Sequence, residues 1–305
     1  MESIFDIVEE RPAFPGYLYR PKKEGTYPGI LLLHGSDGGN GDFWYEPDQK
    51  PLKTGDCSIT PFIARYYARK GYVAYALCYF DCEHHAGFDE YPPQDLKNID
   101  LYNITYKALK WLKESIFVGG KKVAVWGASR GAEQALLFSS ILAEHNQKDK
   151  DRYLEPDAVL ALSPSDKVIG AFPLQAAQAI IAGKEPNWGS EPSWCFHDPI
   201  QIGKKIDLSL CSQPFFLSYF EQDPVWNVQV PPLSLQQGYA NERDIELLIS
   251  EDCMVHPQIE NLKGLSFRSM YVTFQGSGHV VPPFQSPQNF FLKWGIQQFL
   301  RIHLS

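Results

Sequence analysis

The sequence is short of positive charge and has no concentrated basic segment. Its 305 residues contain 28 Lys plus Arg against 36 Asp plus Glu, which gives a formal net charge of −8. A surface that binds nucleic acid needs clustered cations to meet the phosphates. Nucleic acid is therefore excluded as the expected partner.

Targeting and membrane-spanning patterns are also missing. Residues 1–10 include four acidic side chains, where a secretory signal would have a basic start followed by an apolar run. No apolar stretch approaches the roughly 20 residues that a membrane-spanning helix needs. The last three residues, His303-Leu304-Ser305, are not a Ser-Lys-Leu peroxisomal address. These absences predict a cytoplasmic protein without a membrane span.

The chain contains only six cysteines, and they are scattered: Cys57, Cys78, Cys82, Cys195, Cys211 and Cys253. A chain of this length can build a core without disulfide bridges, so mostly free thiols in a reducing compartment are expected. The segment 78–85 combines two cysteines with His84 and His85, but it lacks the Cys-x-x-Cys spacing and the second distant pair of a structural zinc site. We expect neither a metal nor a cofactor.

What the sequence has is an alternation of short apolar runs with longer helical patterns, which predicts an α/β fold with a largely parallel sheet. The whole chain, 1–305, is interpreted as one domain. The expected strands are Gly16–Arg20, Pro28–His34, Val73–Tyr79, Lys122–Trp126, Ala158–Leu162, Pro214–Tyr219 and Met270–Phe274. The expected helices are Thr60–Lys70, Leu96–Lys113, Arg130–Glu144 and Ser286–His303.

Two long segments interrupt this alternation. Ala171–Lys204 is rich in proline, glycine and tryptophan, and Val225–Gly264 is an insertion that separates the last two expected strands. Loops of that length inside a compact domain are usually lids or binding elements, although a surface insertion without a role is the alternative. Large aromatic residues, Trp194 among them, suggest that Ala171–Lys204 forms a lid over the site; a separate small core is the other interpretation.

The strongest motif is Gly127-Ala128-Ser129-Arg130-Gly131, placed between an expected strand and an expected helix. Such a sharp strand-to-helix turn holds its central serine in strained backbone geometry and exposes the hydroxyl above the sheet edge. The flanking glycines are expected because side chains would collide across the turn. In this context the motif predicts that Ser129 is a nucleophile, and a plain structural turn is the alternative.

A serine nucleophile needs a base and an orienting acid. His279 lies in the glycine-rich segment Gly276-Ser277-Gly278 after the last expected strand and is the predicted base. Asp223 follows the preceding expected strand and gives the chain order Ser, Asp, His. Glu221 is its close competitor. Asp166 and Asp252 are more distant ones.

An oxyanion intermediate also needs two preorganised N–H donors. The backbone N–H of Arg130, directly after the nucleophile, is the first predicted donor. Ser36 is the second, with Asp37 as its alternative, because both lie in the glycine-rich loop after His34. This loop fits neither the dinucleotide-binding glycine pattern nor a P-loop, so phosphate binding is not expected there.

Taken with Pro93-Gln94-Asp95-Leu96 and with Pro282-Pro283 after the histidine, these motifs resemble the C-terminal domain of acyl-CoA thioesterases and bile acid-CoA:amino acid N-acyltransferases. That domain is related to dienelactone hydrolases. The resemblance runs from about Pro28 to the C-terminus. It implies an α/β-hydrolase fold with a mostly parallel central sheet, helices on both faces and a lid-like insertion.

The sequence departs from this family in two ways. The N-terminal β-sandwich domain typical of the family is not expected in the few residues before Pro28, and serine stands at the position where the acyltransferases have cysteine. Hydrolysis of an acyl thioester or carboxylic ester is therefore predicted, with a small molecule as substrate. The alternatives are a dienelactone-hydrolase-like carboxylesterase for small esters and a hydrolase-fold protein that binds a ligand without turnover.

Overall fold

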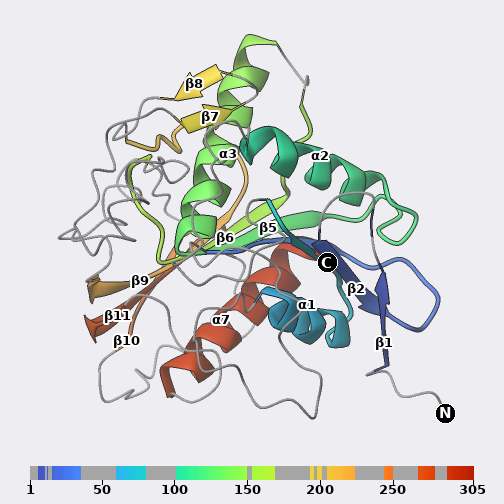
Figure 1. The fold of residues 1–305 in the computed structure, drawn as a ribbon. Coiled ribbons are helices and arrows are strands. Elements are labelled where there is room, and N and C mark those ends of the chain that lie inside the picture. Colours follow the sequence, from blue (N-terminus) through green and yellow to red (C-terminus); the bar gives the residue numbers. More distant parts are fainter. Residues whose placement is uncertain are drawn as a thin grey trace, which may run out of the picture. The chain divides into compact units, whose positions relative to one another are not determined.

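A computed structural model describes residues 6–10, 12, 16–35, 60–79, 101–149, 153–168, 193–195, 198–200, 205–223, 244–249, 267–278 and 287–305. Its strands are β1 (Ile7–Glu10), β2 (Gly16–Pro21), β3 (Gly29–Leu33), β4 (Val73–Leu77), β5 (Val123–Ala128), β6 (Ala158–Leu162), β7 (Ser193–Cys195), β8 (Asp198–Ile200), β9 (Phe215–Gln222), β10 (Ile245–Ile249) and β11 (Met270–Ser277). Its helices are α1 (Thr60–Arg69), α2 (Leu101–Glu114), α3 (Arg130–Lys148) and α7 (Pro287–Leu304) (Figure 1).

The described strands form a nine-stranded sheet and a separate pair, β7-β8. The order in the large sheet is β1-β2-β4-β3-β5-β6-β9-β11-β10. β1, β2 and β4 pair antiparallel in that order, whereas β3-β4, β6-β9, β9-β11 and β10-β11 are parallel. The prediction of an α/β fold with a mostly parallel sheet is confirmed.

Contacts divide the chain into two compact units, one comprising residues 1–125 with 167–205 and the other residues 126–166 with 206–305. In the first unit, α1 and α2 cover opposite faces of the strands (Figure 1). Both faces of β3 and β4 are therefore protected, and every residue of these two strands is buried. This explains their continuous apolar sequence, which is typical of central parallel strands.

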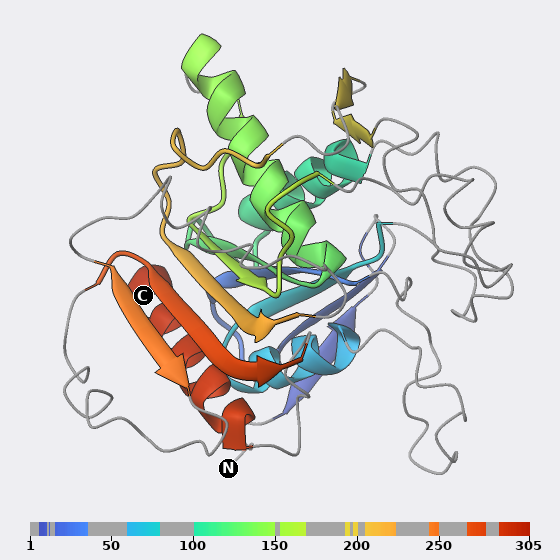
Figure 2. The same ribbon diagram turned by 90° about the vertical axis from the view of Figure 1, so that its left-hand side faces the viewer.

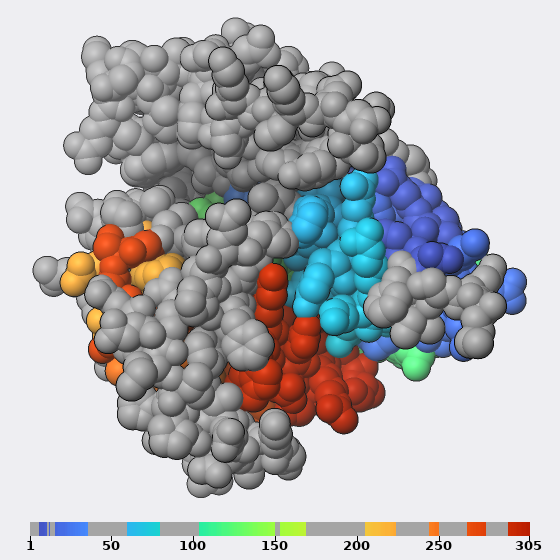
Figure 3. Space-filling model, turned by 90° about the horizontal axis from the view of Figure 1, so that it is seen from below, coloured from blue at the N-terminus to red at the C-terminus, as the bar shows by residue number. Residues whose placement is uncertain are grey.

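In the second unit, α3 and α7 lie on opposite faces of the strands (Figure 2). All five residues of β6 are buried, as are the first six residues of β9. Helix α7 turns one face inward, with Phe299 and Leu300 almost fully buried, and its other face lies at the surface (Figure 3). The catalytic candidates that the structure describes belong to this second unit.

All seven expected strands and all four expected helices are present, with ends shifted by a few residues; residues 96–100 of one expected helix lie outside the described part. The structure adds β1, and it adds β10 inside Val225–Gly264, which the sequence had suggested was a loop. Strand β10 has only two buried residues in five, because it lies at the edge of the sheet beside β11.

The residues that flank the segment Ala171–Lys204 are paired with each other. Lys167 and Lys205 form an antiparallel bridge, and the N–H of Ile206 donates to the carbonyl of Asp166 at 2.9 Å. Within the segment, β7 and β8 pair antiparallel, and β7 contacts α2. The remainder lies outside the described residues, so the lid over Ser129 stays a prediction.

Candidate active site

Ser129 occupies the turn between β5 and α3 with φ 53° and ψ −121°. A positive φ is uncommon for any residue other than glycine and marks local strain. The N–H of Ser129 donates to the carbonyl of Leu162 at 2.8 Å, and its own carbonyl accepts from the N–H groups of Ala132 and Glu133 at 2.9 and 3.1 Å. The strand–turn–helix geometry predicted for the motif is therefore present and is fixed by hydrogen bonds on both sides.

Gly127 is required by the same turn. A Cβ at this position would lie 2.0 Å from the carbonyl oxygen of Gly131 and 2.7 Å from the nitrogen of Ala132. Both distances are far below any real carbon contact, so only glycine fits without moving the start of α3. The sequence had predicted this collision across the turn.

Arg130 is the first residue of α3, and its side chain is 4% exposed. N–H groups in the first turn of a helix point past its N-terminal end, where the helix dipole favours negative charge. Since Ser129 directly precedes this helix, an oxyanion formed when its hydroxyl attacks a carbonyl would lie near that end. The role of the Arg130 N–H as an oxyanion donor stays a prediction.

The two competing carboxylates at the end of β9 differ in burial. Asp223 is 5% exposed, whereas Glu221 is exposed. Gln222 pairs with Ser277 of β11, and the N–H of Gly278 donates to the Gln222 carbonyl at 3.3 Å. The residue directly before Asp223 is therefore hydrogen-bonded to the residue that precedes the predicted base.

Local geometry favours glycine at both glycine positions before His279. Gly276 has φ 87°, and the pairing of β11 with β9 shifts register between Phe274 and Ser277. At Gly278 a Cβ would lie 2.7 Å from the ring of Phe220. The chain thus crosses closely over a buried aromatic ring just before His279, which itself lies outside the described residues.

The order of strands brings the candidates to one edge of the sheet. Ser129 follows β5, Asp223 follows β9, and the chain continues from β11 to His279, while β5, β6, β9 and β11 are successive neighbours. Sites in such folds form outside the carboxyl ends of parallel strands. With β6 between them, β5 and β9 are about 10 Å apart, a gap that an imidazole could bridge. Of the two distant competitors, Asp166 is also buried, and Asp252 lies outside the described residues.

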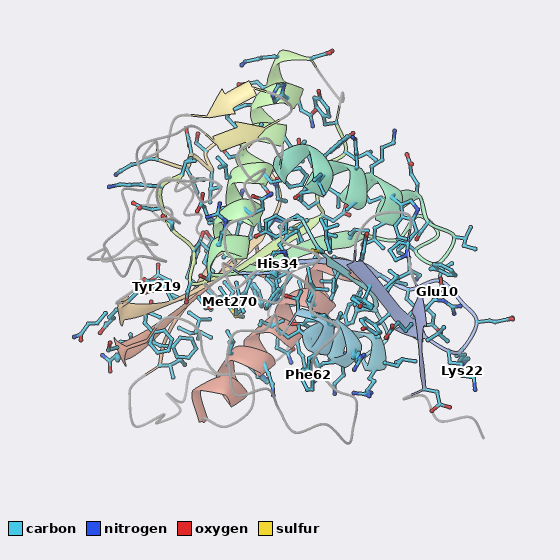
Figure 4. All side chains as sticks on the ribbon, viewed as in Figure 1. Glu10, Lys22, His34, Phe62, Tyr219 and Met270 are labelled. Carbon is cyan, nitrogen blue, oxygen red and sulfur yellow. The ribbon has the colours of Figure 1, made fainter. Side chains whose placement is uncertain are left out.

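The loop that carries the second predicted oxyanion donor belongs to the first unit, and the structure describes only its start. His34, at the end of β3 (Figure 4), is 1% exposed, while Ser36 and Asp37 lie outside the described residues. The His34 Nδ1 is 3.0 Å from the carbonyl oxygen of Gly35, and Nε2 accepts from the N–H of Tyr79 at 3.4 Å. Because an amide N–H can only donate, Nε2 is unprotonated, and Nδ1 carries the proton of a neutral ring.

Tyr79 contacts His34, where the glycine-rich loop begins, in two further ways. Its hydroxyl donates to the carbonyl of His34 at 2.7 Å, and its ring stacks on the imidazole with centroids 4.2 Å apart. Backbone and side chain of His34 are thus tied to one tyrosine. The glycine-rich loop that begins here starts from a rigid point.

Cysteine chemistry differs from the expectation at one position. Cys211 is a free, buried thiol, and burial raises its pKa. Cys78 is disulfide-bonded, so the expectation of mostly free thiols is wrong for this residue. Disulfide formation depends on which cysteines lie within about 4.4–6.8 Å of each other between Cα atoms, and spacing along the chain does not reveal that.

The described residues form neither a metal-binding cluster nor a membrane-spanning helix. No group of three or more His, Cys, Asp or Glu is arranged to hold a metal ion within the part that the structure describes. Of the proposed ligands in segment 78–85, only Cys78 belongs to that part. No described helix is long and apolar enough to cross a membrane.

One residue at this sheet edge was missed by sequence reasoning. Ser163, directly after β6, also has φ 53°, and it is 3% exposed. A serine followed by a proline at the end of a strand is no signal for positive φ; the proline favours extended backbone instead. Only the tertiary structure reveals it.

A mostly parallel sheet, helices covering both faces of the strands in each unit and a strained serine between strand and helix together define the α/β-hydrolase fold. Among solved structures, the chain is similar to a proposed dienelactone hydrolase from Klebsiella pneumoniae, with a TM-score of 0.52, 12% identity and 98% of both chains covered. It also aligns with esterase B from Lactobacillus rhamnosis, with a TM-score of 0.48 and 16% identity over 97% of this chain and 85% of that one.

At these identities the comparisons show the fold and nothing more specific. The chain matches none of the protein-family models and none of the curated protein sequences with which it was compared. The resemblance to acyl-CoA thioesterases therefore stays a prediction.

Proposed function

We propose that this protein is a serine hydrolase that cleaves a small acyl thioester or carboxylic ester. The observation that carries the proposal is the strained turn at Ser129, with φ 53° and a glycine at 127 that no larger residue could replace. Strain of this kind persists where function maintains it. The buried Asp223 at the same sheet edge supports it further.

In the proposed mechanism Ser129 attacks the substrate carbonyl while His279 takes the hydroxyl proton. The carbonyl oxygen becomes an oxyanion, which the backbone N–H groups of Arg130 and Ser36 stabilise. The tetrahedral intermediate then collapses, the bond to the leaving group breaks, and His279 returns the proton to the leaving thiolate or alkoxide. Asp223 holds the imidazole in the required tautomer and stabilises its charged form.

Water completes the cycle. His279 removes a proton from a water molecule, the resulting hydroxide attacks the acyl-serine, and a second tetrahedral intermediate releases the carboxylic acid and regenerates the Ser129 hydroxyl. All proton transfers pass through one histidine. No cofactor or metal is part of the proposal, and a cytoplasmic location stays an expectation from the sequence.

The decisive experiment is labelling with a fluorophosphonate, which an activated serine attacks as it attacks a carbonyl. Intact mass spectrometry should show one adduct on the wild-type protein and none on Ser129→Ala. Ser139→Ala is the matched control, because Ser139 is a fully buried serine ten positions further along α3. Labelling that persists in Ser129→Ala, or a wild-type protein that is never labelled, would refute the proposal; the latter result would favour a ligand-binding protein without turnover.

Substrate class is the second part of the test. An acyl-CoA series and nitrophenyl esters of matched chain length should be compared by kcat/KM. The sequence resemblance favours thioesters, whereas the similarity to a proposed dienelactone hydrolase favours small esters as the second candidate. A consistent preference for the nitrophenyl esters at every chain length would favour the esterase.

A further inference from the structure

Ser163 shares an unusual backbone with the proposed nucleophile. Among the described residues, Ser129 and Ser163 are the two non-glycine residues with positive φ, and both have φ 53°. Ser163 is 3% exposed and is followed by Pro164. A side chain disfavours the left-handed region, and a following proline favours extended backbone. The surroundings must therefore impose this conformation on Ser163.

Hydrogen bonds link the two serines through one peptide. The N–H of Ser129 donates at 2.8 Å to the carbonyl of Leu162, the residue directly before Ser163. The N–H of Ser163 in turn donates to the carbonyl of Ser218 at 2.7 Å, in continuation of the Leu162–Ser218 pairing of β6 with β9. Ser129 and Ser218 therefore hold the two sides of the peptide between Leu162 and Ser163.

The shared peptide links their conformations. The carbonyl that accepts from Ser129 belongs to the peptide between Leu162 and Ser163, and rotation about φ of Ser163 turns this peptide relative to the rest of Ser163. The same peptide supplies the N–H that is held by Ser218. Strand β9 therefore holds the N–H side of this peptide. The positive φ of Ser163 lets β6 end at Leu162 while the Leu162 carbonyl still accepts from the N–H of Ser129.

We propose that Ser163 is a positioning residue for Ser129. The inference rests on the proposed function, and it adds that the nucleophile is held by a second strained serine directly after the neighbouring strand β6. A return of Ser163 to extended backbone would shift the Leu162 carbonyl and release the Ser129 N–H. Misplacing a reacting group by about 1 Å costs on the order of 100-fold in rate.

Two substitutions separate the backbone of Ser163 from its hydroxyl. Ser163→Gly removes the hydroxyl and makes positive φ easy, whereas Ser163→Thr keeps the hydroxyl but adds a β-branch, for which positive φ is a genuine outlier. We expect kcat of the glycine variant to stay within about threefold of wild type and kcat of the threonine variant to fall about 10- to 100-fold with little change in KM. The rate constant of phosphonylation should follow kcat, and its pH profile should keep its midpoint because the base is unchanged.

Ser139→Thr is the control, since it adds the same methyl group at a fully buried serine of α3. If Ser163→Thr lowers the melting temperature as this control does but retains kcat, the role is merely structural and the proposal is overturned. Loss of activity in the glycine variant would assign the role to the hydroxyl and overturn it as well. The activity of the glycine variant still tests the proposal if the threonine variant does not fold.

The two proposals fail in different ways. A wild-type protein that the fluorophosphonate never labels refutes the proposed function. A labelled wild type beside an equally reactive Ser163→Thr variant refutes only the positioning role.

Discussion

Gly127→Ala tests whether the turn at Ser129 supplies the reactivity of the site. The added Cβ would stand 2.0 Å from the carbonyl oxygen of Gly131 and 2.2 Å from its carbonyl carbon, so β5 and the start of α3 must separate by at least about 1 Å. A displacement of that size should lower the rate about 100-fold. Overpacking of this kind should also cost about 1–3 kcal/mol of the free energy of unfolding.

The assay is the second-order rate constant for fluorophosphonate labelling, measured beside urea unfolding. Gly120→Ala provides the control: Gly120 has φ 79°, but a Cβ there meets nothing within 4 Å. It should lose about 1 kcal/mol of stability through backbone strain and keep its full rate. If Gly127→Ala reacted within about threefold of wild type, the expected link between the geometry of the turn and the reactivity of Ser129 would be wrong.

Two further substitutions test the acid and the loop at the end of β3. Asp223→Asn should lower kcat by about 10⁴-fold without unfolding the protein, because the amide favours the wrong imidazole tautomer; the exposed Glu221→Gln should have little effect, and a reversed ranking in steady-state kinetics would make Glu221 the acid. Tyr79→Phe leaves the buried His34 carbonyl without its 2.7 Å donor and should lower the free energy of unfolding by about 1–3 kcal/mol. Tyr27→Phe, which removes an exposed hydroxyl-to-carbonyl bond of 2.9 Å, should cost under about 0.5 kcal/mol in the same urea titration, and equal losses would contradict this account.

The amino-acid sequence by itself determined the class of fold and the turn at Ser129. The expected strands and helices follow from local periodicity, which depends on which side chains neighbouring elements will cover. The run Ala158–Leu162 was predicted to the residue, because a central parallel strand is apolar on both faces. The glycine at 127 was equally readable, since the collision that it avoids involves residues only four or five positions away.

Tertiary structure decided the features that depend on contacts between distant segments. Burial distinguishes Asp223 from Glu221, and the register of β9 with β11 brings the Gln222 carbonyl to the N–H of Gly278. Edge strands such as β10 have too little buried surface to show a clear pattern in the sequence. The pairing of Cys78 likewise depended on proximity in space.

Ser163 shows the physical reason most directly. Its own preference and that of Pro164 favour extended backbone, yet its φ is 53°. Hydrogen bonds link it to Ser218 directly and, through the Leu162 carbonyl, to Ser129; these partners lie 34 or more positions away in the chain. Local backbone preferences are worth about 1 kcal/mol per residue, so a few such long-range hydrogen bonds are enough to override them. The residues next to Ser163 in the sequence therefore could not have predicted its positive φ.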